Sequence, residues 1–255
     1  MSIIFNYVTL AISSLVGCNI ALYMFSSVSP TAEFLARLLA SYLSLVACAL
    51  YGVLASVFLR LIGYGRISQW ATARCFKYVM WYATGVTFEV DDPHDYLNRT
   101  RPAVFISNHQ TELDVLLLGN IFPKYCSVTA KSSLRHTPLL GWFMTLSGTV
   151  FIDRQNSTSA REAMAGAAGE IRRHRQSVYM FPEGTRSYYK EPGLLPFKKG
   201  AFHLAVQAKV PIVPIVVSNY SDILNVRSWT FKGGKIPVKG RAHGTNMWHT
   251  ISDVS

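Results

Sequence analysis

Two long stretches without charge near the start of the chain most constrain its fold. Residues 7–25 and residues 38–59 contain no Asp, Glu, Lys or Arg. Each stretch is long enough to cross about 30 Å of hydrocarbon as an α-helix. Pro30 and the polar residues around it lie between the two stretches, and such an interruption ends a helix. The sequence therefore predicts an N-terminal hydrophobic helical hairpin.

The charges around the predicted hairpin indicate its orientation in a membrane. The short loop side carries only Glu33 and Arg37, and the second stretch is followed by four cations, Arg60, Arg66, Arg74 and Lys77. By the positive-inside rule, the rest of the chain lies on the cytoplasmic side. Two alternatives stay open. The first stretch could be a cleaved signal peptide, although it lacks a positive region before its apolar core, and the second could lie within one leaflet.

Residues 68–85 combine aromatic side chains with two cations. Trp70, Trp81 and Tyr82 are accompanied by Arg74 and Lys77. Indole and phenol rings favour the depth of lipid headgroups, so this composition is typical of a helix lying at the membrane surface. An ordinary helix covering the protein core would show the same residues, and the sequence does not separate the two interpretations.

The composition narrows the class of partner. Only 15% of the 255 residues are charged, although the net charge is +11. A basic excess favours anionic membrane surfaces, nucleic acids or acidic substrates. The sequence shows no nucleic-acid-binding module, so we expect anionic membrane lipids, and no nucleic acid, as partners. The sequence does not indicate an oligomeric state.

The cysteines predict neither a disulfide framework nor a metal site. The four cysteines are Cys18, Cys48, Cys75 and Cys126, and none forms a CxxC pair. Two of them, Cys18 and Cys48, lie within the hydrophobic stretches. Within such stretches a thiol behaves as a small apolar side chain. This pattern indicates a reducing compartment for the rest of the chain.

From about residue 86 the chain alternates between short β-rich runs and helical patterns. The runs are 86–90, 103–107, 126–130, 148–152, 177–181 and 212–217. The clearest helical pattern is apolar at spacings of three and four residues between Ala160 and Ile171. Strands that alternate with helices indicate an α/β domain with a mixed, largely parallel sheet flanked by helices.

His109 and Asp114 follow the second of these runs and form a candidate catalytic pair. Five positions along a helix separate two side chains by about 140°, so they meet only if His109 precedes the helix and Asp114 lies in its first turn. Asp114 would then orient the imidazole, and the free ring nitrogen would take a proton from a substrate hydroxyl. The alternative is structural, because Thr111 and Asp114 also have the spacing of a helix capping box.

Several residues at predicted strand ends are suited to bind a phosphate group. Gly184 permits close backbone approach, Thr185 offers a hydroxyl, and Arg186 has a guanidinium that grips two phosphate oxygens. Further cations follow other runs or precede a helix, at Lys131, Arg154, Lys198 and Lys199. Strand ends on one edge of an open sheet converge, so these cations are expected to form one site. The alternative for each is a solvated surface cation, which for Lys199 is the preferred interpretation.

Four blocks in this order resemble the glycerolipid (PlsC-like) acyltransferases, specifically the fungal type of lysophosphatidic acid acyltransferase. The blocks are NHxxxxD (Asn108, His109, Asp114), residues 148–154 ending in Arg154, FPEGTRS at 181–187, and VPIVPI at 210–215. Lys131, residues 138–142 and residues 195–200 match as well, and the likeness covers roughly residues 38–220.

The resemblance implies transfer of a fatty acyl group from acyl-CoA to the sn-2 hydroxyl of lysophosphatidic acid, which gives phosphatidic acid. It implies that His109 is the base and Asp114 its orienting group. Glu183, Gly184, Arg154 and Arg186 would bind the glycerol phosphate. No metal or organic cofactor is expected beside the acyl-CoA co-substrate. The family suggests a membrane location, the endoplasmic reticulum or lipid droplets, with the catalytic domain facing the cytoplasm.

These interpretations divide the chain into three parts. Residues 1–66 hold the membrane segments, residues 67–234 the acyltransferase domain, and residues 235–255 a polar tail with neither helical nor strand periodicity. A frame change, a retained intron or an alternative exon would explain such a tail. Two functional alternatives therefore stay open. One is an acyltransferase for another acceptor, such as glycerol-3-phosphate or another lysophospholipid, and the other is an inactive, C-terminally truncated membrane form.

Overall fold

The computed structural model describes residues 2–153 and 155–240 and contains a mixed, largely parallel seven-stranded sheet. Its strands, in sheet order, are β1 (Val86–Asp91), β9 (Gly234–Gly240), β6 (Ile212–Val217), β2 (Val104–Ser107), β5 (Ser177–Met180), β3 (Cys126–Lys131) and β4 (Val150–Ile152). Every neighbouring pair is parallel except β6 and β9. The predicted α/β class is therefore confirmed.

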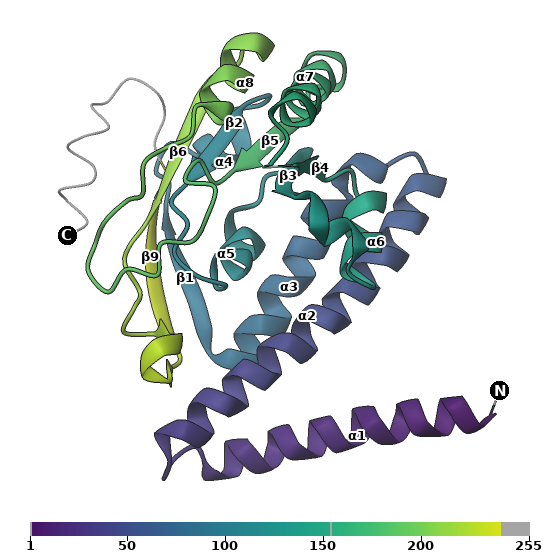
Figure 1. Cartoon of the computed structure of the whole chain (residues 1–255), viewed down its shortest axis with the longest axis vertical. Coiled ribbons are helices and arrows are strands. Elements are labelled where there is room, and N and C mark those ends of the chain that lie inside the picture. Colours follow the sequence, from purple (N-terminus) through teal and green to yellow (C-terminus); the bar gives the residue numbers. More distant parts are fainter. Residues whose placement is uncertain (1, 154, 241–255) are drawn as a thin grey trace.

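Helices cover both faces of the sheet (Figure 1). The α-helices of the described residues are α1 (Ser2–Phe25), α2 (Pro30–Leu61), α3 (Ser68–Thr84), α4 (Tyr96–Arg99), α5 (Asp114–Ile121), α6 (Leu140–Leu146), α7 (Ser157–His174) and α8 (Gly200–Ala208). Helix α1 packs mainly on α2 and lies away from the sheet. One core lies between the sheet and α2, α3 and α5, and a smaller core lies under α7 and α8. Strand β2 is buried on both sides, because Phe105 enters the first core while Val104 and Ile106 enter the second. An apolar run without alternation is typical of such a strand.

The two N-terminal helices are longer than predicted. Helix α2 begins at Pro30 rather than Leu38, because Pro30 occupies the first helical position, where no backbone N–H is needed. Ser29 caps this end by accepting a hydrogen bond from the Ala32 N–H (3.3 Å). The added turns bury Phe34 and Ala36 against the rest of the protein.

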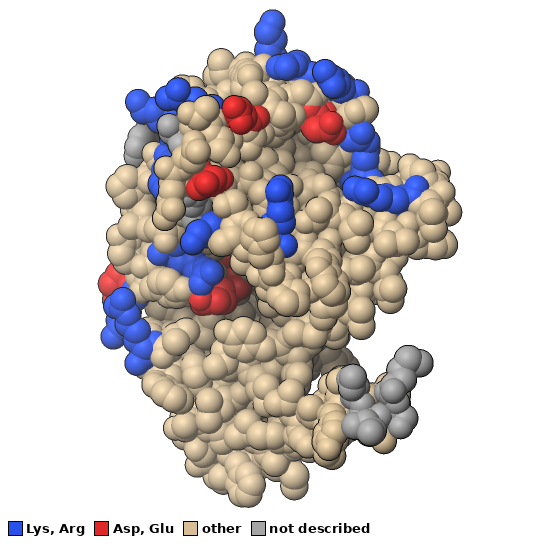
Figure 2. Space-filling view, turned by 45° about the vertical axis from the view of Figure 1, so that its right-hand side comes forward, with Lys and Arg blue, Asp and Glu red and all other residues tan. Residues whose placement is uncertain are grey.

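Helices α1 and α2 are each long and apolar enough to cross a membrane, with mean hydropathies of 1.8 and 2.1 over their candidate spans. The side chains of α1 between residues 5 and 18 are exposed, although most are apolar. The lower part of the molecule in Figure 2, where these helices lie, shows almost no charged side chains, whereas Lys and Arg side chains gather above it. This segregation of charge supports association of the N-terminal part with a membrane.

Helix α3 combines the core contacts of an ordinary helix with exposed aromatic side chains. Phe76 and Met80 are buried in the first core, whereas Tyr78, Trp81 and Tyr82 are exposed. The helix therefore covers the core with one face and presents aromatic rings on another. Gly85 ends it in the left-handed conformation (φ 70°), where glycine carries no steric penalty.

Strand β9 corrects the interpretation of residues 235–240 as part of an irregular tail. These residues pair with β1 on one side and, from Val238 onward, with β6 on the other. Ile236 and Val238 are buried, while Lys235 and Pro237 point outward. The period of two is therefore present, but it spans only these few residues and includes a proline, which disfavours strands. Residues 241–255 lie outside the described part of the chain.

Candidate active site

The residues predicted to carry chemistry follow strands that end at the same edge of the sheet. Strands β2, β3, β4, β5 and β6 run in one direction. His109 follows β2, Lys131 ends β3, and residues 181–187 follow β5. Adjacent strands are about 4.8 Å apart, so β3 ends roughly 10 Å from β2. The carboxyl edge of the sheet thus collects the base and the candidate phosphate-binding groups.

His109 and Asp114 meet in the way that their spacing required. His109 lies in the loop after β2, and Asp114 is the first residue of α5. Their side chains form a hydrogen bond between Nδ1 and Oδ2 of 2.7 Å, with Asp114 fully buried. When the imidazole donates its Nδ1 proton to Asp114, Nε2 keeps a lone pair that can accept a proton. In the part of the chain that the structure describes, no hydrogen bond occupies Nε2.

Asp114 also has the capping function that was considered as an alternative. Its Oδ2 accepts the backbone N–H groups of Gln110 (2.5 Å) and Thr111 (3.2 Å). The latter bond is the return half of a capping box. These bonds hold the loop that carries His109 against the start of α5, so the capping and orienting roles coexist in one carboxylate.

Tyr220 is a buried partner of Asp114 that the sequence interpretation missed. Its hydroxyl donates to Asp114 Oδ1 (2.7 Å) and also contacts Thr111 through Oγ1 (2.9 Å) and the backbone N–H (3.2 Å). Burial, followed by the negative charge of Asp114, raises the pKa of Tyr220 well above its ordinary value, so the phenol stays protonated. Tyr220 thus fixes the carboxylate oxygen that His109 does not use. No motif marked it, since it lies 106 positions from Asp114.

If His109 acts as a base, we expect Tyr220→Phe to lower kcat by about tenfold while KM for the substrate changes less than twofold. The substitution keeps the ring but removes one hydrogen bond to a charged group, worth about 1.5–3 kcal/mol, and so loosens Asp114 behind the base. Steady-state kinetics would measure this split. Tyr189→Phe is the matched control, because that side chain is exposed. An unchanged kcat, or a change confined to KM, would contradict the positioning role.

The segment after β5 is tied directly to the loop that carries the base. The His109 ring stacks on Phe181, with centroids 4.1 Å apart and planes 21° apart. The Ser187 N–H donates to the His109 carbonyl (2.9 Å), and the Tyr188 N–H donates to the Gln110 carbonyl (3.1 Å). The base and the predicted phosphate-binding turn therefore form one structural unit.

Glu183 lies inside this unit and contacts backbone rather than open space. It is 2% exposed, and its two oxygens accept the N–H groups of His109 (2.6 Å) and Leu195 (2.9 Å). Burial raises the pKa of the Glu183 carboxyl, and the two backbone donors oppose that rise. The resemblance implied a substrate-binding role, whereas this geometry favours positioning the loops around the site.

Gly184 and Lys198 are brought together beside Glu183. Gly184 has a φ of 71°, and a Cβ built on it would lie 3.0 Å from Lys198 Cδ, Cε and Nζ. The positive φ favours glycine here, and a Cβ would also require the end of the Lys198 side chain to shift. The Lys198 N–H donates to the Pro182 carbonyl (2.8 Å), which holds this lysine next to the turn.

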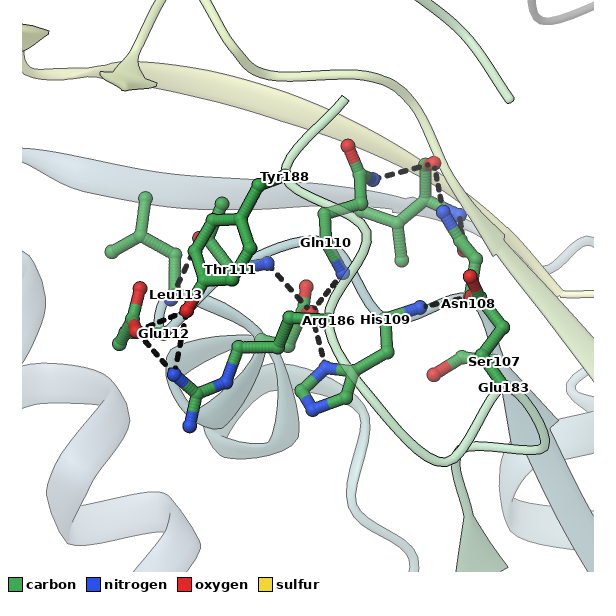
Figure 3. A network of polar contacts seen from close by, with 12 residues as sticks. Ser107, Asn108, His109, Gln110, Thr111, Glu112, Leu113, Glu183, Arg186 and Tyr188 are labelled. Atoms are coloured by element: carbon green, nitrogen blue, oxygen red, sulfur yellow. Dashed lines mark hydrogen bonds and ion pairs between the residues drawn. The ribbon is translucent and has the colours of Figure 1, made fainter. Parts of the chain in front are cut away.

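Arg186 is held beside the start of α5 by two side chains that the sequence interpretation did not select. Its Nη1 contacts Glu112 and donates to the Tyr188 hydroxyl (2.8 Å), and Tyr188 donates to Glu112 (2.7 Å) (Figure 3). Among the described residues, no partner contacts Nε or Nη2. That edge of the guanidinium is available for an anion, and the half-exposed pair with Glu112 contributes orientation more than stability.

The other predicted residues stand apart from these contacts. Thr185 and Lys131 are exposed, and neither makes a side-chain hydrogen bond within the described ranges. Arg154 lies outside the described residues. The VPIVPI block, interpreted as core or as a wall of an acyl pocket, contributes Pro214 and Ile215 to an apolar cavity of about 80 Å³ that Asn108 and Gln110 also line.

Comparison with known proteins bears directly on this arrangement. A family model described as Acyltransferase matches residues 89–218, which contain His109, Asp114 and the 181–187 turn. The chain belongs to this acyltransferase family. His109, Asp114 and the 181–187 turn thus lie within the matched acyltransferase region.

Individual relatives agree with this membership. The chain is 45% identical over 197 residues to the 1-acyl-sn-glycerol-3-phosphate acyltransferase of Saccharomyces cerevisiae, covering 77% of this chain and 64% of the relative. It is 42% identical to an uncharacterised acyltransferase of Schizosaccharomyces pombe, covering 80% and 72%. It is 43% identical to the human 1-acyl-sn-glycerol-3-phosphate acyltransferase beta, covering 65% and 57%. The matched part thus spans just under two thirds of the first relative and somewhat over half of the human one.

A solved structure confirms the fold of this acyltransferase chain. The crystal structure of the 1-acyl-sn-glycerophosphate (LPA) acyltransferase PlsC from Thermotoga maritima superposes with a TM-score of 0.67. It covers 89% of this chain and 93% of that chain at 22% sequence identity. The shared architecture therefore extends beyond residues 89–218, which the family model matches.

Proposed function

We propose that this acyltransferase transfers a fatty acyl group from acyl-CoA to the sn-2 hydroxyl of 1-acyl-glycerol-3-phosphate and forms phosphatidic acid. The observation that carries the proposal is the His109–Asp114 pair, joined by hydrogen bonds to a segment bearing Arg186. A base for an alcohol and a cation for a phosphate then lie on neighbouring loops. The names of the yeast and human relatives support this acceptor.

In the proposed reaction, His109 Nε2 removes the proton of the acceptor hydroxyl as its oxygen attacks the thioester carbonyl carbon. The C–O bond forms, the C–S bond breaks, and the departing CoA sulfur takes the proton from His109. Asp114 stabilises the imidazolium formed between these steps. The hydroxyl itself is the nucleophile, so the reaction needs no acyl-enzyme, and we propose that it needs no cofactor beside acyl-CoA.

The cations at this edge have a clear role in the proposal. Arg186 presents its uncontacted guanidinium edge to the phosphate of the acceptor, with Lys198 beside Gly184. Lys131 and Arg154 follow neighbouring strands and are proposed as further contacts. Glu183 holds the two loops in place through its backbone contacts. The acceptor thus enters with its headgroup at the carboxyl edge of the sheet.

The location of the enzyme follows from its lipid substrate and its apolar N-terminal helices. We propose that α1 and α2 anchor it to the endoplasmic reticulum or to lipid droplets, with the catalytic domain facing the cytoplasm. Anionic lipids are proposed as partners of the basic chain. Strand β9 occupies the sheet between β1 and β6.

Kinetics with a set of acceptor substrates, measured for the wild-type protein and for Arg186→Gln, would test this proposal. Purified protein in neutral detergent would receive oleoyl-CoA with lysophosphatidic acid, glycerol-3-phosphate, lysophosphatidylcholine or monoacylglycerol. We expect the highest kcat/KM with lysophosphatidic acid. Arg186→Gln should raise KM for that acceptor about tenfold or more, since it removes a charged contact to the phosphate. The slow reaction with monoacylglycerol, which has no phosphate, should not change.

Two outcomes of the same panel would contradict the proposal. A preference for glycerol-3-phosphate would assign a different acceptor, and absence of any acylated product would reject the reaction. Arg173→Gln on the exposed side of α7 is the charge-matched control. An equal rise of KM in both variants would mean that Arg186 acts only through net charge.

A further inference from the structure

A second cluster of basic side chains lies at the amino ends of the parallel strands, opposite the carboxyl ends where His109 lies. A groove of about 680 Å³ opens there between α4, the last turns of α7 and α8, and the residues that lead into β2 and β6. Its polar lining is His94, Tyr96, Arg99, Thr100, Arg101, Arg172, Arg175 and Lys209. We call it the basic groove. It contains five Lys or Arg side chains and no Asp or Glu among its lining residues.

Two of these arginines are held side by side by the backbone. Arg101 Nε donates to the Arg175 carbonyl (3.0 Å), and Arg175 Nη2 donates to the Arg101 carbonyl (2.7 Å). The Arg101 guanidinium also lies 3.8 Å above the Tyr125 ring. Neither guanidinium has a carboxylate partner in the described part of the chain. Like charges fixed at close range without a counterion favour binding of an anion.

The ends of two helices account for only part of this charge. The C-terminal ends of α7 and α8 favour nearby cations, which explains Arg172, Arg175 and Lys209. Arg101 precedes β2 and is not explained in this way, whereas Arg99 ends the four-residue helix α4. Arg99 pairs only with Asp95, at 3.5 Å, where both side chains are exposed. The groove therefore carries more positive charge than helix ends alone require.

The groove is separate from the catalytic site. Pro102 lines it and His109 lies beyond the other end of β2, so at about 3.3 Å per residue the two sites are roughly 20 Å apart. Helices α7 and α8 lie at the end of the molecule away from α1 (Figure 1). A ligand of the groove thus approaches from the side facing away from the apolar helices.

We propose that the basic groove binds a soluble nucleoside polyphosphate. Its cations match a run of phosphates, its volume lies within the range of small-molecule sites, and its floor is apolar at Ile171, Ala208 and Val210. The rings of His94 and Tyr96, with centroids 5.3 Å apart, provide aromatic surface for a base. The combination fits a planar aromatic group joined to several phosphates better than an inorganic anion alone.

The test is titration of the full chain, in neutral detergent at 150 mM salt, with ATP, tripolyphosphate and adenosine by calorimetry. We expect saturable binding of ATP that is at least tenfold tighter than binding of tripolyphosphate, with no heat from adenosine. The variant Arg99→Gln/Arg172→Gln removes two exposed groove cations and should weaken ATP binding at least tenfold. The control Arg161→Gln/Arg173→Gln removes two exposed α7 cations that do not line the groove and should change it less than twofold.

Five results would overturn the proposal. The first four are the absence of ATP binding at 1 mM, equal weakening in both double variants, equal affinity for ATP and tripolyphosphate, and displacement of ATP by saturating CoA. The fourth would place the nucleotide in the acyl-CoA site instead. Loss of ATP binding when the protein is moved into nanodiscs containing a phosphoinositide would assign the groove to a lipid headgroup. Thermal unfolding of each variant within 2 °C of wild type establishes that the fold is intact.

Discussion

His109→Ala is expected to lower kcat for the proposed acylation of lysophosphatidic acid by about 10²–10⁴-fold, with KM for both substrates little changed. The substitution removes the group that takes the hydroxyl proton, and general-base catalysis contributes about that factor. Asp114→Asn should lower kcat within the same range, because an amide no longer holds the Nδ1 proton that leaves Nε2 free. Steady-state rates of phosphatidic acid formation would measure both effects.

His203→Ala is the matched control for the loss of an imidazole, since that residue is exposed on α8. The double variant His109→Ala/Asp114→Asn should be about as slow as the slower single variant, because the two groups act as one unit. Full activity of His109→Ala would reject the mechanism, and multiplied losses in the double variant would show that the two groups act independently.

Val238→Asp should destabilise the catalytic domain by about 3–5 kcal/mol, the range for a buried, unpaired polar or charged group. Val238 is 0% exposed in the core beside β1 and β6. Lys235→Asp introduces the same carboxyl group on the outward face of the same strand, where the side chain is exposed, and should cost less than about 1 kcal/mol. Thermal unfolding in detergent, followed by circular dichroism, would compare the two variants.

This pair of variants also measures whether β9 belongs to the cooperative unit of the domain. Equal, small effects would contradict the position of β9 inside the sheet. A loss of activity in Val238→Asp that is recovered on cooling would show that the chemistry itself does not use this residue.

The sequence predicted the elements whose periodicity is strong. The six β-rich runs became β1 to β6, because continuous apolar runs such as 103–107 leave few other structures open to them. The helix through Ala160 and Ile171 appeared as α7, with Ala168 and Ile171 buried. Strand β9 was missed, because two apolar residues separated by a proline give a weak local signal.

The candidate active site likewise contains contacts that could be predicted from the sequence and contacts that could not. His109 and Asp114 lie within one local motif, so their contact could be deduced from spacing and a strand-to-helix turn. Tyr220 reaches the site through a contact with Asp114 over 106 positions, and Glu112, although inside the motif, contacts Arg186 over 74 positions. Residue types such as these occur throughout the chain, and only the folded backbone selects them. Glu183 was predicted to lie near His109, but the motif did not indicate that its carboxylate would accept backbone N–H groups.

The main-chain hydrogen bonds from Ser187 and Tyr188 to the loop of His109 mean that the conformational entropy of these loops is lost during folding rather than on substrate binding. Because the loops that carry His109 and Arg186 are joined during folding, neither loop has to be ordered when substrate arrives. The distance between the two loops is then the same before and after the substrate binds. We expect rigid inhibitors that match this span to outperform flexible ones carrying the same two headgroups.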